Sequence, residues 1–329
     1  MPGPTNGIHL DISALPDQAE TIRWGVPAWQ GLWRGSPLIK IYDVNGCRIA
    51  IIPTNLLSHG SASEAWQQIV TIIGCCVEFN NGRLYSPGPG GLSPIDESVW
   101  LIPGNYIFGT QSEATGEWLP CQPLEGPCGR RVGRLPQPDD GEEPDEDEDD
   151  DYIDEEDDAG SQNSMSVSSR TARAGQYKFK LQLAMRDGTC LATGVNSYHN
   201  VGAHIIPISR PDLYKMLLGP EMTSSLYAVD MGILLSPDLH KSFDALQWAF
   251  FPRETDMVLH VFNTDDPDIA KLHGRVVPHS SFRVNDSRDF PDPRLLLFHY
   301  RQCVQMYFRY YSYKVSARDG LERNVGRII

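Results

Sequence analysis

The sequence predicts an α+β protein built from two folded units that a long acidic linker joins. Three observations lead to this prediction. Residues 38–111 alternate strand-like runs with a helical run, residues 112–175 are poor in apolar side chains, and residues 176–329 again mix strand-like and helical runs. A chain of 329 residues is long enough for two ordinary domains. Residues 1–37 then form an N-terminal extension of the first unit.

The first unit opens with the pattern of a β-hairpin. Two β-rich runs, at 39–43 and 47–52, flank the dipeptide Asn45-Gly46, which favours a tight turn between antiparallel strands. A helical run and further strand-like runs follow. This order resembles a small β-grasp-like arrangement, in which a hairpin, a helix and more strands form one sheet with a helix across it.

The helix of this unit is marked at its start. Ser61 and Glu64 stand three residues apart before an apolar periodic run over 62–73, and this spacing predicts a capping box. Gly74 follows that run, and glycine is the usual residue just past a helix end. We therefore expect the helix to end there.

The acidic character of the chain is local. The formal net charge is -15, but residues 139–158 hold sixteen Asp and Glu and no Lys or Arg, so the rest of the chain is nearly neutral. The whole linker at 112–175, in which a Ser-rich stretch at 161–169 follows the acidic run, buries too little apolar surface to offset its chain entropy, and it is predicted to be disordered. The acidic run is either a solvated spacer or a tail that docks a basic protein partner or competes with nucleic acid.

In the second unit, a short helix carries two metal-ligand side chains. Ser236 suits the N-cap, Pro237 the first helical position and Asp238 the first turn. His240 and Asp244 lie four residues apart, so they share one face of this helix. An imidazole and a carboxylate at that spacing can bind one divalent cation.

A third candidate residue precedes that helix. His204 lies in a strand-like run at 202–208, and a second such run at 232–235 leads into the helix. If His204 faces the same site, its imidazole can activate a water molecule as a general base. A single histidine in an apolar strand is more often structural, so the hypothesis depends on the neighbouring motifs.

Other histidines and Cys190 lack neighbouring motifs of this kind. His199, His260 and His299 have no partner pattern and are predicted to be structural or surface residues. Cys190 lacks the companions of a zinc site and is predicted to be a buried small hydrophobe. The apolar periodicity of residues 293–314 predicts a closing amphipathic helix that packs in the core.

The order of these motifs resembles a known domain. Gly-Ala-His-Ile-Ile-Pro around His204, Gly-Ile-Leu-Leu at 232–235 and Leu-His-Lys-Ser-Phe-Asp around His240 resemble the HNH endonuclease domain, a ββα-metal fold, in the version common in uncharacterised basidiomycete fungal proteins. The resemblance implies that His204 is the general base and that His240 and Asp244 are metal ligands. It also implies a divalent cation, with Mg²⁺ expected and Mn²⁺, Ni²⁺ or Zn²⁺ as alternatives.

Two positions depart from the family pattern. Met231 stands where the family usually has an asparagine that orients the base, and a thioether does not replace its hydrogen bonds. Asp230 is a possible substitute, but neighbouring residues of a strand point to opposite faces. Ala203 stands where many HNH enzymes have another metal ligand. The predicted site thus has two protein ligands and needs substrate phosphate to complete it.

The resulting hypothesis is a metal-dependent endonuclease that hydrolyses phosphodiester bonds of nucleic acid, with DNA as the expected substrate. The alternative is a catalytically weakened HNH scaffold that binds nucleic acid or protein; restoring activity by Met231→Asn would favour the first. Arg186, Lys178 and Lys180 precede the motifs and are predicted to contact phosphates, or else are ordinary charged outer positions.

The expected location is intracellular, either cytoplasmic or nuclear. Residues 1–11 lack the basic start and apolar run of a signal peptide, and no stretch of about 18 apolar residues predicts a membrane span. The seven cysteines are scattered without a CxxC pair, as is typical of reduced thiols.

Overall fold

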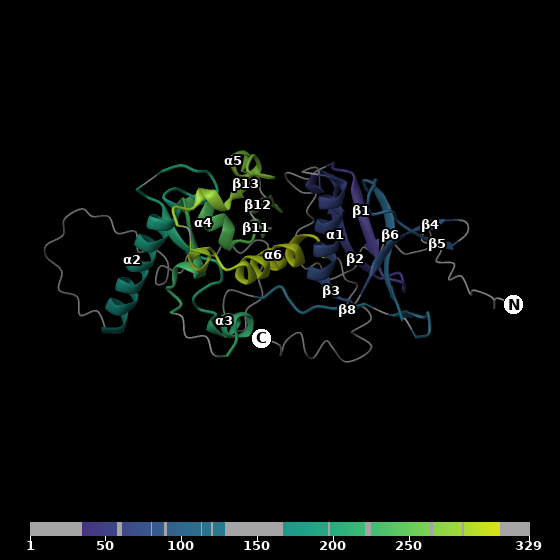
Figure 1. The fold of residues 1–329 in the computed structure, drawn as a ribbon, viewed down its shortest axis with the longest axis horizontal. Coiled ribbons are helices and arrows are strands. Elements are labelled where there is room, and N and C mark those ends of the chain that lie inside the picture. Colours follow the sequence, from purple (N-terminus) through teal and green to yellow (C-terminus); the bar gives the residue numbers. More distant parts are fainter. Residues whose placement is uncertain are drawn as a thin grey trace.

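The computed structural model describes residues 35–309 with gaps. Not described within that span are 58–60, 80, 89–90, 113, 120, 129–166, 197, 221–224, 255, 264–265 and 285. The acidic run at 139–158 and the predicted N-terminal extension up to residue 34 therefore lie outside the described residues. The closing helix predicted over 293–314 ends already at Tyr307, because Phe308 caps it and Arg309 forms a β-bridge with Ala50, so its predicted length was wrong. The described part forms two lobes along the long axis of the molecule, with helix α6 between them (Figure 1).

The first lobe is a mixed sheet covered by one helix. Its strands are β1 (Leu38–Tyr42), β2 (Arg48–Pro53), β4 (Arg83–Gly88), β5 (Gly91–Pro94), β6 (Gly104–Gln111) and β7 (Trp118–Leu119). The strand order is β2-β1-β6-β4-β5, and β7 pairs with β6. β1 is antiparallel to β2 and parallel to β6, so a parallel pair lies inside an otherwise antiparallel sheet.

The predicted hairpin of β1 and β2 is confirmed. Its turn is held by Asp43, whose Oδ1 accepts the backbone N–H groups of Asn45 at 2.9 Å and Cys47 at 2.7 Å. Gly46 adopts φ 78°, a conformation that costs glycine little and other residues more. The turn dipeptide thus does what its sequence predicted.

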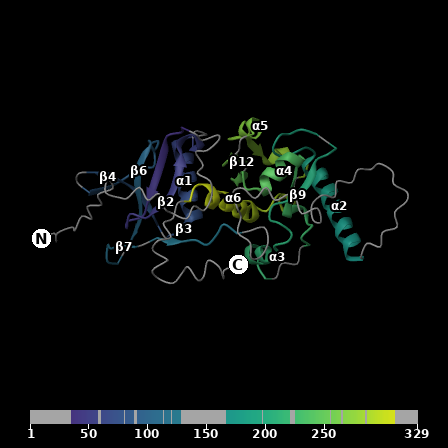
Figure 2. The ribbon, with the colours of Figure 1, turned by 180° about the vertical axis from the view of Figure 1, so that it is seen from behind.

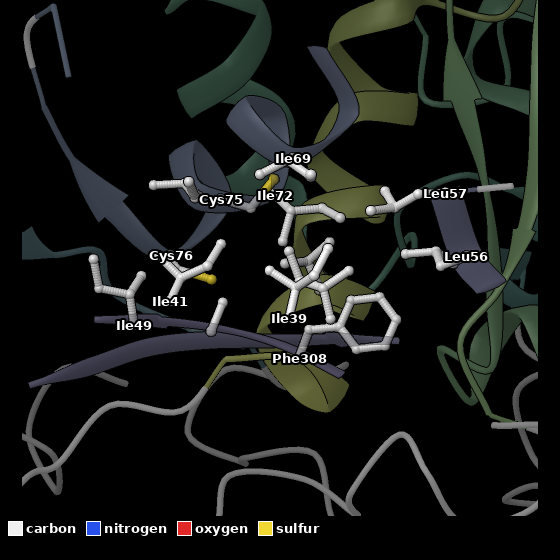
Figure 3. Close-up of a cluster of buried hydrophobic side chains, with 14 of the residues drawn as sticks. Ile39, Ile41, Ile49, Leu56, Leu57, Ile69, Ile72, Cys75, Cys76 and Phe308 are labelled. Atoms are coloured by element: carbon white, nitrogen blue, oxygen red, sulfur yellow. The ribbon is translucent and has the colours of Figure 1, made fainter. Parts of the chain in front are cut away.

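Helix α1 (Ala62–Cys76) covers the sheet, and its capping box is confirmed. The Ser61 backbone donates to Glu64 Oε2 at 2.6 Å, and the Glu64 backbone donates to Ser61 Oγ at 3.2 Å. The expected end at Gly74 was wrong, because Cys75 and Cys76 are buried in the core and their packing favours one more half-turn. Figure 3 shows side chains of α1 meeting those of β1 across this core.

The chain beyond β6 differs from the predicted linker. The structure describes residues 114–128 apart from 120. They include β7 and then β8 (Gln122–Pro123), which pairs with β3 (Val77–Glu78). Cys121, just before β8, is buried in the core of the first lobe, and the backbone of Leu124 donates to Cys76 O at 2.9 Å. Backbone pairing, which composition does not reveal, orders this part of the segment.

The second lobe holds the motif region. Its helices are α2 (Val167–Asp187), α3 (Pro211–Leu218), α4 (Pro237–Asp244), α5 (Pro267–Ala270) and α6 (Pro293–Tyr307). Its strands are β9 (Val201–His204), β10 (Gly232–Leu235), β11 (Trp248–Pro252), β12 (Asp256–Val261) and β13 (Val276–Pro278). Short 3-10 turns are η3 (Thr54–Leu57) in the first lobe, and η4 (Val229–Met231), η5 (His279–Ser281) and η6 (Ser287–Asp289) in the second. β9 and β10 form an antiparallel hairpin, and β11, β12 and β13 form a second antiparallel sheet.

Helix α6 belongs to both cores. Leu295 and Leu296 pack in the core of the second lobe, whereas Val304 and Phe308, just beyond the helix end, pack in the core of the first. Figure 2, from behind, shows α6 between α1 and the second lobe. The two predicted units therefore share one apolar helix. None of the described helices combines the length and apolarity that a membrane crossing requires.

Candidate active site on the β9–β10 hairpin and α4

The β9–β10 hairpin has two differently covered faces. His204 pairs with Gly232, and Ala203 pairs with Ile233. Ala203 and Ile233 are buried in one cluster with apolar side chains of α4, so α4 covers their face. His204 points to the other face, where its ring stacks on Phe179 of α2. Side-chain alternation along a strand produces this division.

Helix α4 spans the residues that its sequence predicts. Ser236 is the N-cap residue and Pro237 occupies the first helical position, as predicted, although the Ser236 side chain makes no capping hydrogen bond. Instead, the Ser236 backbone N–H points to Cys190 Sγ at 3.4 Å, and its carbonyl accepts the His240 N–H at 2.9 Å. The start of α4 is thus tied to the chain before β9.

The structure brings His240 and Asp244 together. Nε2 of His240 lies 3.2 Å from Oδ2 of Asp244, and their side chains are 23% and 14% exposed. Two ligands of one cation at metal–ligand distances of about 2.1 Å lie about 3 Å apart, so this nitrogen–oxygen pair fits a shared divalent ion. Over the described residues, no three His, Cys, Asp or Glu side chains are grouped to hold a metal. Water and phosphate oxygens would have to supply the other ligands.

Three neighbours among the described residues contact the ring of His204. Nε2 lies 3.1 Å from the carbonyl oxygen of Leu226. The Phe179 ring stacks on it at 4.3 Å with an interplanar angle of 18°, and the Tyr227 ring meets it edge-on at 5.6 Å. Because a carbonyl only accepts, Nε2 carries the hydrogen, and Nδ1 of the neutral ring carries the lone pair. A base at this position would act through Nδ1.

The comparison with protein families identifies this region. Residues 190–250 match the family model described as HNH endonuclease. The segment is an HNH endonuclease domain. The predicted resemblance is thereby confirmed, whereas its basidiomycete character stays a prediction. Searches of curated proteins and of solved structures gave no match to the chain.

The HNH match contains β9, β10 and α4, and it ends in β11. It therefore includes His204, His240 and Asp244 but not α2, which supplies Phe179. The structure does not show His204 converging with the His240–Asp244 pair: the His204 ring lies on the α2 face of the hairpin, whereas α4, which carries the pair, covers the other face. That the three groups act on one phosphate stays a prediction.

The position of the usual HNH asparagine is part of the core. Met231 is 1% exposed and packs with the buried cluster of the second lobe. Only its backbone serves the hairpin, because its carbonyl accepts the Ile205 N–H at 3.0 Å. Asp230 is half-buried in η4, and this burial raises the pKa of its carboxyl, with a further contribution from Asp292. The structure offers no polar replacement at 231 itself.

Arg186 is a structural residue of the HNH lobe, which corrects its predicted role as a phosphate contact. It is 1% exposed and pairs with Asp187. Its five N–H donors are directed to the Asp187 carboxylate and to the carbonyls of Val229, Gly232 and Asp289. Guanidinium donors used in this way are not available to a substrate.

The two lysines of α2 remain at the surface. Lys178 is exposed, and Lys180 is partly exposed with Nζ 5.7 Å from the Tyr198 ring centroid. Both remain predicted phosphate contacts.

The three histidines without a partner pattern and Cys190 behave as predicted. His199 is exposed, whereas His260 is buried and bonded to Tyr300 Oη at 3.1 Å. His299 stacks on Phe243 at 3.7 Å, and burial lowers its pKa to about 3. Cys190 is fully buried among apolar side chains.

Sequence reasoning missed the groups that contact His204. Phe179 precedes it by a long stretch of chain, and Leu226 and Tyr227 follow it in a loop. One signal was present: Gly232 opens β10, where any Cβ would lie 2.3 Å from Phe179 Cζ. A glycine opposite a candidate base marks a close approach by another element.

Proposed function

We propose that this protein is a metal-dependent endonuclease that hydrolyses phosphodiester bonds of nucleic acid, most readily DNA. The HNH match suggests nuclease activity in general. The observation that carries the finer proposal is the contact of 3.2 Å between His240 Nε2 and Asp244 Oδ2 on the HNH helix. Both are ligands that divalent cations accept, and both are accessible from solvent in part.

In this proposal His240 and Asp244 hold one divalent cation, with Mg²⁺ expected and Mn²⁺, Ni²⁺ or Zn²⁺ as alternatives. Such an ion stabilises negative charge on phosphate oxygens when it is bound. His204 Nδ1 would take a proton from the attacking water as the water oxygen bonds to phosphorus; the P–O bond to the leaving sugar oxygen breaks, and that oxygen takes a proton from solvent. The imidazolium that results keeps its Nε2–H bonded to Leu226 O, which stabilises the positive charge. Lys178 and Lys180 of α2 attract the phosphate backbone.

A plasmid-nicking assay with Mg²⁺, Mn²⁺, Ni²⁺ and Zn²⁺ tests this function. We expect cleavage with at least one metal, and a loss of about 100-fold or more in His204→Ala. Asp244→Asn should need a higher metal concentration. His199→Ala is the matched control, because it removes an exposed imidazole of the same lobe.

Equal residual cleavage in wild type and His204→Ala would refute His204 as the base. If the wild-type protein fails to cleave with any of the four metals but still retards DNA in a gel, the result would point instead to a catalytically weakened binding module.

We also propose a β-grasp-like fold for the first lobe. Its support is the hairpin, helix and strand order, with the parallel β1–β6 pair at the centre of the sheet. A protein partner for this lobe or for the acidic segment, and a cytoplasmic or nuclear location, remain part of the proposal. Pull-down with and without residues 139–158 would test the partner.

A further inference from the structure

Two aromatic rings from outside the hairpin enclose the His204 imidazole. Phe179 is fully buried and lies nearly parallel to the imidazole, with ring centroids 4.3 Å apart. Tyr227 meets both rings edge-on, at 5.6 Å from His204 and 6.1 Å from Phe179. The face of His204 toward α2 and one edge are therefore occupied by aromatic carbon.

Glycines make this arrangement possible. At Gly232, opposite His204, a Cβ would lie 2.3 Å from Phe179 Cζ, so only glycine admits the Phe179 ring. At Gly175 on α2, a Cβ would lie 3.0 Å from Tyr227 Cε2. Both rings thus pack directly on backbone, and neither has space to shift toward it.

The helix that carries Phe179 is attached to the same hairpin at two positions, one on each side of Phe179. Gln176 Nε2 donates to Gly202 O at 3.3 Å in β9. At the other end of α2, Arg186 donates to Gly232 O at 2.8 Å in β10. Phe179 lies between these two attachments, which determine its distance from His204.

The third neighbour comes from the same loop as Tyr227. The backbone of Ala228 donates to Ser225 O at 2.9 Å, and that of Tyr227 donates to Ser225 Oγ at 3.2 Å. This turn directs the Leu226 carbonyl toward His204 Nε2. One loop therefore supplies both an aromatic edge and the acceptor that selects the Nε2–H tautomer.

We infer that Phe179 and Tyr227 are positioning residues for His204: with the Leu226 carbonyl they hold its ring plane and keep Nδ1 as the basic nitrogen. The catalytic meaning of this clamp rests on the proposed function. The clamp supplies the orientation that the resemblance assigns to an asparagine at position 231, where this chain has a buried methionine. It also gives α2, outside the HNH match, a part in the site.

The first test does not need activity. The nitrogen shifts of the imidazoles are read by ¹⁵N NMR above neutral pH, and His204 is assigned from the spectrum of His204→Ala. We expect wild type to show the Nε2–H tautomer alone. Phe179→Leu and Tyr227→Leu should show a mixture of tautomers, whereas Tyr227→Phe, which keeps the ring, should resemble wild type.

The second test separates positioning from packing. Leu183→Met changes a buried residue of the same α2 cluster and serves as the packing control. We expect kcat to fall about tenfold to 100-fold in Phe179→Leu and Tyr227→Leu with KM little changed, because misplacing a catalytic group acts on the chemical step. Tyr227→Phe and Leu183→Met should retain wild-type kcat.

The two hypotheses fail separately. If folded Phe179→Leu and Tyr227→Leu proteins keep the single Nε2–H tautomer, the clamp is refuted, whatever the nuclease assay shows. If wild type cleaves no substrate but the tautomer changes as expected, the clamp stands and the proposed function falls. Unchanged kcat in both leucine variants of an active enzyme would also refute positioning.

Discussion

In the β9–β10 hairpin, His204 stands directly opposite Gly232, and the Phe179 ring packs against both residues. The base candidate and the glycine are therefore a single structural feature. Because residue 232 has no side chain, α2 can approach the strand that carries the imidazole.

Gly232→Ala should destabilise the protein by about 1–3 kcal/mol, because the new methyl group would overlap Phe179 and the Ala203 carbonyl. Urea unfolding measures this free energy. Gly104→Ala in β6 is the control, since its nearest contact would be Tyr106 at 3.8 Å. It should change stability by less than about 1 kcal/mol. Equal effects of the two substitutions would contradict the predicted overlap.

Met231→Asn should not restore an HNH site. The position is 1% exposed in an apolar cluster, so an asparagine there buries an amide without a partner and costs about 1–3 kcal/mol. Thermal unfolding together with the nicking assay checks this, with Met231→Leu as the control of similar volume. A variant that cleaves faster than wild type at unchanged stability would show that position 231 faces the site.

His299 should make the protein less stable in mild acid. Burial lowers its pKa from 6.5 to about 3, so the folded protein keeps the imidazole neutral while the unfolded chain takes up a proton below pH 6.5. Its stabilising contribution is present at pH 7 and is lost as the pH falls through 6.5 toward 3. From this residue alone, the free energy of unfolding should fall by about 2 kcal/mol between about pH 7 and pH 5.

His299→Gln isolates this effect, since it keeps a donor for the Phe243 carbonyl but does not titrate. Urea unfolding of both proteins at neutral and mildly acidic pH gives the difference in their pH dependence. Other titrating groups cancel in that difference. Parallel loss of stability in wild type and variant would show that His299 is not responsible.

The second lobe should not fold well alone. Cys303 and Val304 of α6 are fully buried in the core of the first lobe, and burial of an aliphatic side chain such as that of Val304 contributes about 1.5–3 kcal/mol. A fragment of residues 167–309 should therefore bind a hydrophobic dye and aggregate, and co-expression with residues 35–128 should suppress both. A soluble monomeric fragment with the thermal midpoint of the whole chain would contradict the shared core.

Local features were predictable because short-range chemistry decides them. The Asn45-Gly46 turn, the Ser61–Glu64 capping box and the start of α4 were all predicted correctly. The order of motifs was also enough to indicate an HNH domain. The i,i+4 spacing on α4 places His240 and Asp244 in contact, as expected for neighbours on one helix face.

Other assignments failed or were missed where distant segments decide them. Arg186 has the positive charge that a phosphate contact needs. However, Val229, Gly232 and Asp289 come from elsewhere in the chain, accept its hydrogen bonds and bury it. No periodicity indicates that Phe179 reaches His204. The packing of α6 into both cores is equally invisible, since an apolar face does not specify its partner.

The amino-acid sequence alone thus determined which candidate catalytic and metal-binding side chains the hairpin and α4 carry and the spacing between them. Tertiary structure alone decided which layer covers each face of the hairpin, and so which groups surround His204. The physical reason is that alternation along a strand separates two faces, while the choice of what packs on each depends on volumes and donors brought from far along the chain.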